Sequence, residues 1–120
     1  MMTAPDAATA VGFGDRPGPS RLRLISWQPF RKGPLRGFAC VEISAIGLRI
    51  YDVPIRTGTN GLWAGLPAKP ELDRDGRRKT DINGRALYKP VAEWRTREIS
   101  DRFSEAVIAA VRRAHPGDLD

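Results

Sequence analysis

Alternating apolar and polar residues predict β-strands in the first half of the chain. Leu22 and Leu24 alternate with Arg21 and Arg23, and Ile25 and Trp27 continue this short run until Pro29 interrupts it. Residues Gly37 to Ile46 then place an apolar side chain at every second position, which is typical of a strand with one buried face. The segment between them, residues 30 to 35, contains Gly33 and Pro34 and is predicted to be a basic turn.

Two further strands are predicted before the middle of the chain. Leu48 to Ile55 is rich in β-branched and aromatic side chains, and Pro54 favours a sheet edge or a strand end for it. Leu62 to Leu66 is apolar, too short for a helix, and followed by Pro67. Beyond it, Asp75-Gly76 predicts the tip of a protruding hairpin.

The last third of the chain has helical periodicity. Thr96 is the predicted N-cap, Trp94 belongs to the segment before it, and Pro116-Gly117 ends the helix. The expected fold class is therefore α+β, a small antiparallel sheet of four or five strands followed by a C-terminal amphipathic helix. The apolar face of that helix comprises Ile99, Phe103, Ala106, Val107, Ala110, Val111 and Ala114.

A length of 120 residues fits one domain. We expect residues 1–20 to be a flexible tail without the features of a signal peptide, 21–115 to form the domain, and 116–120 to be a short tail. No internal repeat is evident. Since one helix covers one face of such a sheet, a second copy of the chain is expected to bury the other face or an edge, giving a homodimer.

The balance of charge indicates an anionic partner, with nucleic acid the first candidate. The formal net charge is +6, and the basic excess lies in residues 21–36, which carry five basic and no acidic side chains, and in residues 67–90, which carry seven against four. The side chains predicted to contact phosphate from these segments are Arg31, Lys32, Arg36, Arg74, Arg77, Arg78 and Lys79. A solvated, purely structural role for these loops is the alternative.

The sequence contains no recognisable catalytic or metal-binding set. The single cysteine, Cys40, fits a buried strand position, and the single histidine, His115, follows the helix. Asp73-Arg-Asp75-Gly has the start of a calcium loop, but Arg78 stands where that loop needs glycine. We therefore expect no enzyme activity, no cofactor and no metal. The aromatic side chains Trp27, Tyr51 and Trp63 are expected in the core, and stacking on bases is the open alternative for them.

A dense segment in the middle of the chain resembles the SpoVG family (stage V sporulation protein G, septation regulator). The segment reads Ile50-Tyr-Asp-Val-Pro-Ile55, then Gly58-Thr-Asn-Gly-Leu-Trp-Ala-Gly-Leu-Pro-Ala-Lys69, with Asp75-Gly76 and Asp81-Ile82 beyond it. The resemblance extends over about Leu22 to Val111. It implies a dimeric sheet-plus-helix bacterial regulator that binds DNA and, in some members, RNA, and it adds Lys69 to the nucleic-acid-binding residues.

The sequence thus predicts a cytoplasmic, non-enzymatic regulator that binds DNA or RNA and has no membrane partner. Two alternatives remain open. One is a protein-interaction adaptor whose charge serves solubility and whose sheet edge or Asn60-Gly61 turn binds another protein. The other is a small dimeric single-stranded-DNA binder of the PC4 or Whirly type.

Overall fold

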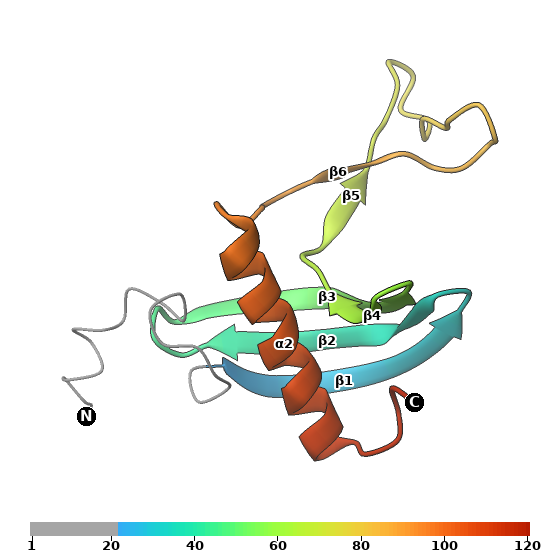
Figure 1. The fold of residues 1–120 in the computed structure, drawn as a ribbon. Helices are drawn as coiled ribbons and strands as arrows, with labels where there is room; N and C mark the ends of the chain where they lie inside the picture. Colours follow the sequence, from blue (N-terminus) through green and yellow to red (C-terminus); the bar gives the residue numbers. More distant parts are fainter. Residues whose placement is uncertain (1–21) are drawn as a thin grey trace.

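The computed structural model describes residues 22–120, so the expected tail of residues 1–20 lies outside the described part. The fold class is α+β, as predicted, with one helix packed across a four-stranded antiparallel sheet and a second, two-stranded sheet projecting from it (Figure 1). The elements are β1 (Leu22–Lys32), β2 (Leu35–Ile43), β3 (Leu48–Gly58), β4 (Gly61–Ala64), β5 (Ala68–Pro70), β6 (Tyr88–Pro90) and α2 (Arg97–Ala114). No helix of these residues has the length and apolar character needed to cross a membrane.

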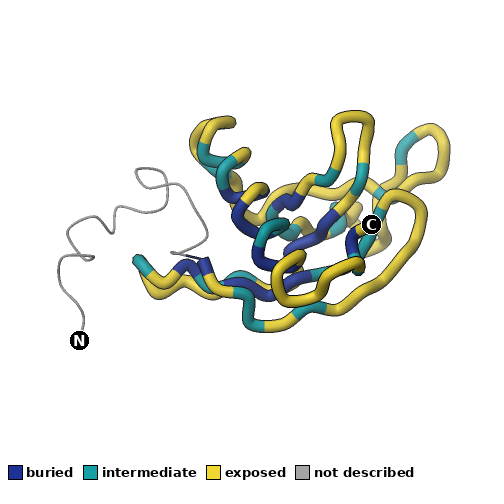
Figure 2. Tube along the Cα trace, turned by 60° about the horizontal axis from the view of Figure 1, so that its bottom comes forward, coloured by how far each residue is buried: buried dark blue, intermediate teal, exposed yellow. Residues whose placement is uncertain are grey.

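The main sheet follows chain order, β1-β2-β3-β4, and all its neighbouring strands are antiparallel. Opposed residues share a face, so each ladder row is wholly inside or wholly outside. The row Trp27, Ala39 and Val53 faces α2, and Leu24, Val41 and Ile50 form the next inner row. Figure 2 shows the buried residues gathered where the helix meets the sheet, while the projecting loops are exposed.

The position of Pro54 corrects the expectation of an edge or a strand end. Pro54 is buried in β3, between β2 and β4, opposite Phe38. Its carbonyl accepts a hydrogen bond from the Gly65 N–H (3.1 Å), just beyond the last β3–β4 pair at Ala64. In an extended strand the nitrogen and the carbonyl of one residue point toward the same neighbouring strand. The Pro54 nitrogen therefore faces the β4 side, and its missing N–H removes no hydrogen bond from the β2–β3 ladder.

Pro29 does not end the first strand either. β1 continues to Lys32, so residues 30–32 belong to the strand and the turn is reduced to Gly33 and Pro34. β1 is an edge strand of the sheet, which is where proline is tolerated. Gly37 lies opposite Pro29 with the Trp27 ring over it, and β2 ends at Ile43, three residues before the predicted end.

α2 has the predicted start and most of the predicted face. The Thr96 hydroxyl accepts a hydrogen bond from the Ile99 N–H (3.2 Å), which satisfies one free amide of the first turn. Phe103, Val107 and Val111 are fully buried against the sheet, whereas Ala114 at the end of the face is exposed. Trp94 lies before the helix, as expected, and packs its ring against Phe103 with centroids 5.0 Å apart.

The C-terminal residues expected as a short tail fold back against the sheet. Leu119 is buried in the same core as α2, and the carboxylate of Asp118 accepts a hydrogen bond from the Trp27 indole N–H (2.9 Å). Leu119 thus belongs to the core, and residues 116–120 pack against the domain and are not a free tail.

Candidate nucleic-acid interface

The predicted hairpin around Asp75-Gly76 is part of a longer projection, which we call the arm, residues 68–90. The arm leaves the sheet after β4 and returns to the segment before α2, with β5 and β6 forming its base (Figure 1). None of the buried hydrophobic residues of the described chain lies within residues 68–90. The arm is therefore outside the core, and its shape comes from its own hydrogen bonds.

Two consecutive hairpin loops of equal length form the outer part of the arm. They are the first lobe, residues 71–79, and the second lobe, residues 79–87. Three main-chain hydrogen bonds of 2.9 Å close their common base in a ring, since the N–H groups of Glu71, Lys79 and Leu87 donate to the carbonyls of Leu87, Glu71 and Lys79 respectively. The chain thus returns to the same point every eight residues.

A short sequence repeat underlies these lobes, although no internal repeat is predicted from the sequence. Residues 73–77 read Asp-Arg-Asp-Gly-Arg, and residues 81–85 read Asp-Ile-Asn-Gly-Arg. In each lobe the first aspartate accepts two main-chain N–H bonds, at 2.8 and 2.9 Å, from the residues two and four positions later. Each glycine has φ of +81°, a left-handed conformation that favours glycine. The pattern Asp-x-Asp/Asn-Gly-Arg was a signal that could have predicted both lobes.

These bonds give the Asp73 side chain a structural role in the first lobe. Its carboxylate oxygen is occupied by the amides of Asp75 and Arg77, as expected for a side chain that shapes a turn. No group of three or more potential metal ligands is found among residues 22–120.

The basic side chains of the arm are exposed, and none forms an ion pair with another described residue. The predicted Lys69, Arg74, Arg77, Arg78 and Lys79 all lie here, brought together by the two lobes and the base. Sequence analysis missed two more, Arg85 and Lys89, on the second lobe and on β6. Since unpaired, solvated cations remain available to phosphate, the arm is the strongest candidate surface for an anionic partner.

The three predicted residues of the β1–β2 region lie apart from the arm, at the end of the main sheet (Figure 1). Arg31 donates to the main-chain oxygens of Asp118 and Asp120, both at 2.8 Å, and so fixes the C-terminal turn. Arg36 donates to the carbonyls of Gly33 and Leu35 at 3.0 and 3.3 Å. Lys32 is exposed and makes no such hydrogen bond to another described residue. The structure therefore gives Arg31 and Arg36 structural roles and does not join this group to the arm.

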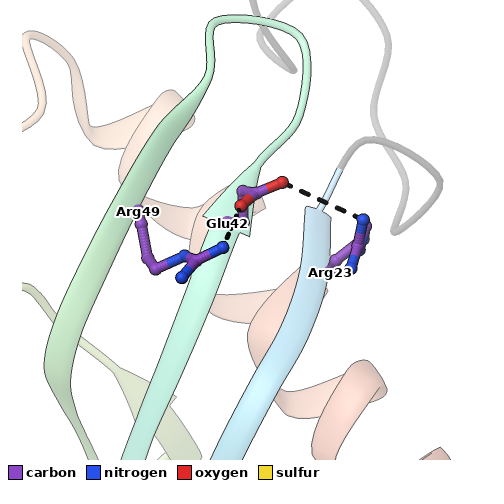
Figure 3. Close-up of polar contacts among 3 residues, drawn as sticks. All are labelled: Arg23, Glu42 and Arg49. Atoms are coloured by element: carbon purple, nitrogen blue, oxygen red, sulfur yellow. Dashed lines mark hydrogen bonds and ion pairs between the residues drawn. The ribbon is translucent and has the colours of Figure 1, made fainter.

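The outer face of the main sheet, opposite α2, contains an ionic row. Glu42 on β2 lies between Arg49 on β3, at 2.8 Å, and Arg23 on β1, at 4.0 Å (Figure 3). The hydrogen bond from Arg49 lowers the pKa of Glu42 below its ordinary value, and the same bond raises the pKa of Arg49. Both arginines of this row are thus engaged by one carboxylate.

Two aromatic residues expected in the core are instead exposed on this outer face. Tyr51 is 62% exposed and Trp63 is 45% exposed, so the core prediction was wrong for both. Phe30, 49% exposed, lies beside Phe38 with ring centroids 6.3 Å apart. Trp27 is on the inner face and half-buried, consistent with the core expectation. The uncovered face therefore combines exposed aromatic rings with the arginines of the ionic row.

The remaining candidate chemistry is sparse. Cys40 is buried in β2, as expected, and His115 is exposed at the C-cap of α2. An open groove lies between the base of the arm and the first turn of α2, with Tyr88 and Arg97 in its wall, and Trp63 also lines it from the edge strand β4.

Comparison of the chain with protein-family models, with curated proteins and with solved structures finds no match in any of the three. The resemblance to the SpoVG family therefore stays a prediction from the residues quoted for it.

Proposed function

We propose that this protein binds nucleic acid through the arm, whose basic side chains contact the phosphates, and that it acts by binding rather than by catalysis. The observation that carries the proposal is the concentration of seven basic side chains, unpaired among the described residues, on one projecting element of 23 residues. The resemblance to the SpoVG family extends the proposal to a regulator acting on DNA or RNA.

The physical support is that an arm outside the core can approach a polyanion from several sides. The acidic side chains of the arm oppose the approach of a polyanion only in part, because Asp73 and Asp81 accept hydrogen bonds from main-chain N–H groups of their own lobes. Phosphate contacts provide affinity without sequence information, so the proposal specifies the class of partner and the contacting surface.

The test is fluorescence anisotropy of the protein with labelled duplex DNA, single-stranded DNA and RNA, each over a series of salt concentrations. We expect binding that weakens steeply with salt. Replacing Arg74, Arg77 and Arg78 together by alanine should weaken it strongly, and removal of each phosphate contact should reduce the log–log salt slope on duplex DNA by about 0.9.

A matched control is available on the helix. Arg77→Ala with Arg78→Ala removes two adjacent arginines from the arm, and Arg112→Ala with Arg113→Ala removes two from the end of α2 furthest from it (Figure 1). The net charge changes equally in both. Equal loss of affinity would mean that overall charge, not the arm, binds the nucleic acid, and absence of salt-dependent binding by the unmodified protein would overturn the proposal.

A second candidate is single-strand binding on the outer face of the main sheet, as in the PC4 or Whirly alternative. The exposure of Tyr51 and Trp63 favours it, because bases stack on exposed aromatic rings at roughly 1–3 kcal/mol each. Alanine at both positions should then weaken binding of single strands and leave duplex binding unchanged. The arm variants should weaken duplex binding and leave single-strand binding unchanged.

A further inference from the structure

We propose that Ile82 is an apolar wedge that inserts between base pairs of duplex DNA from the minor groove, so that the arm bends the duplex. This inference rests on the proposed function and specifies its substrate as duplex DNA. It follows from the position of one side chain, the turn that holds it and the residues beside it.

Ile82 stands at the tip of the second lobe and projects into solvent. Its side chain is 98% exposed, the highest value among the exposed large apolar side chains of the described residues. A single exposed apolar residue is ordinary on a protein surface, so exposure by itself indicates little. The relevant observation is that this one occupies the tip of one of the two lobes of an element that carries seven cations.

The residues around Ile82 are those that read a minor groove. Asn83 is beside it in the turn, and Arg85 follows Gly84. Proteins that bind in the minor groove use arginine, lysine, asparagine and glutamine at the base edges and insert isoleucine, leucine, phenylalanine, methionine or proline between base steps. The second lobe has an apolar wedge with a polar residue on one side and a basic residue close behind.

The turn that presents Ile82 is closed by four hydrogen bonds within the second lobe. Asp81 accepts from the amides of Asn83 and Arg85, its own N–H donates to the Arg85 carbonyl (2.8 Å), and Gly84 donates to the Asp81 carbonyl (3.0 Å). Because the loop is already ordered, insertion does not require ordering it on binding. That leaves more of the contact energy to offset the unstacking of one base step.

The first lobe has the same turn as the second lobe but a different residue at its tip. By the eight-residue repeat, Arg74 occupies the tip position that Ile82 has in the second lobe. Two turns of one geometry therefore present a charged tip suited to phosphate and an apolar tip suited to a base step. We infer that the lobes act together, the first on the backbone and the second in the groove.

Charge argues against a second copy of the chain as the occupant of this tip. Two arms brought together would each bring an excess of basic side chains, whereas a DNA groove is flanked by phosphates that attract them. The wedge proposal thus fits both the apolar tip and the charge around it.

The test compares Ile82→Ala with the unmodified protein on a duplex that carries a dye at each end and aminopurine at a central A·T step. Energy transfer between the dyes reports the bend, and aminopurine fluorescence reports unstacking. We expect the unmodified protein to bend the duplex by about 20–90° and to increase the aminopurine signal. Ile82→Ala should lose both effects and keep the salt slope, because no phosphate contact is removed.

Leu72→Ala is the matched control, since Leu72 is an exposed apolar residue of the same arm away from the tip, and it should keep the bend. Binding with no bend, or with a bend that Ile82→Ala retains, would overturn the wedge and leave the proposed function standing. Absence of binding by the unmodified protein would overturn both. If Ile82→Ala halves the mass in sedimentation, the tip contacts a second copy and the wedge is wrong.

Discussion

The closest packing around any glycine in the main sheet is found at Gly37. A Cβ atom there would lie 2.5 Å from the Gln28 carbonyl oxygen and 2.5 Å from the edge of the Trp27 ring. The ring is held in place by its indole hydrogen bond to Asp118. Because glycine has no side chain, position 37 of β2 leaves room for the Trp27 ring of β1, which in turn binds the C-terminal turn.

Gly37→Ala is therefore expected to destabilise the fold by roughly 1–3 kcal/mol, the range for inserting an atom into a well-packed site. Chemical denaturation followed by tryptophan fluorescence measures the change. Gly58→Ala is the control, because nothing lies within 4 Å of its added Cβ and its conformation is open to other residues. A similar stability of the two variants would contradict the packing described for Trp27.

The ionic row on the outer face of the sheet makes stability depend on acid pH. The pKa of Glu42 is lowered, chiefly by the hydrogen bond from Arg49, so the folded state favours its ionised form. Its contribution is complete above the ordinary value of 4.5 and is lost as the pH falls through the lowered pKa. Because the pair lies at the surface, its effect is small and sensitive to salt.

We expect Glu42→Gln to have a lower denaturation midpoint than the unmodified protein at neutral pH, with the difference disappearing in acid. Denaturant titrations at several pH values measure it. Glu105→Gln, on the exposed side of α2, is the control. A difference that persists unchanged at low pH would show that Glu42 acts through packing and not through its charge.

At the scale of elements, local signals in the sequence were sufficient to predict where the helix begins and which of its residues are buried. Thr96 as N-cap and the buried positions Phe103, Val107 and Val111 follow from spacing alone, since a cap and an apolar face involve residues at most a few positions apart. The tip at Gly76 followed for the same reason. Each prediction needed no knowledge of which elements pack together.

The predictions that failed depended on distant parts of the chain. Pro54 was misplaced because its tolerance in β3 depends on where β4 ends. Tyr51 and Trp63 were assigned to the core because alternation separates the two faces of a strand without identifying the one that the helix covers. The hydrogen bonds of Arg31 to Asp118 and Asp120 were not predicted for the same reason, because these partners lie almost the whole domain away in sequence.

The arm contributes no buried hydrophobic residue to the core of the described chain, so a shortened arm tests stability and binding separately. Glu71 and Leu87 are already joined by a main-chain hydrogen bond of 2.9 Å, so an Asn-Gly turn could close the arm in place of residues 72–86. The paired strands β5 and β6 would remain.

We expect the free energy of unfolding of this shortened protein to lie within about 0.5 kcal/mol of that of the full chain, as for surface changes away from the core. We also expect it to lose salt-dependent binding to nucleic acid. Thermal unfolding and anisotropy measure the two properties on the same sample. Retained binding would move the interface to the main sheet, and a large loss of stability would mean that the lobes contact the core.

At the scale of the whole molecule, the two faces of the main sheet have different environments. The inner face is covered by α2 and the C-terminal turn, and the outer face presents Tyr51, Trp63 and Phe30 to solvent. Aromatic side chains of this size are typical of the centre of protein interfaces as well as of stacking surfaces for bases. A second copy of the chain and a single strand of nucleic acid would therefore compete for one surface.

We expect the predicted homodimer to form through this outer face, because the arm repels its own copy while the arginines of the ionic row are already paired. Sedimentation equilibrium should give the mass of two chains, and Tyr51→Ser with Trp63→Ser should return it to one, since the change removes the apolar contacts that hold the copies together. Serine at Ile46 and Leu48, exposed at the β2–β3 turn, is the control and should leave the mass unchanged. A single-chain mass for the unmodified protein would contradict the dimer, and a selective loss of single-strand binding in the aromatic variant would then assign this face to nucleic acid.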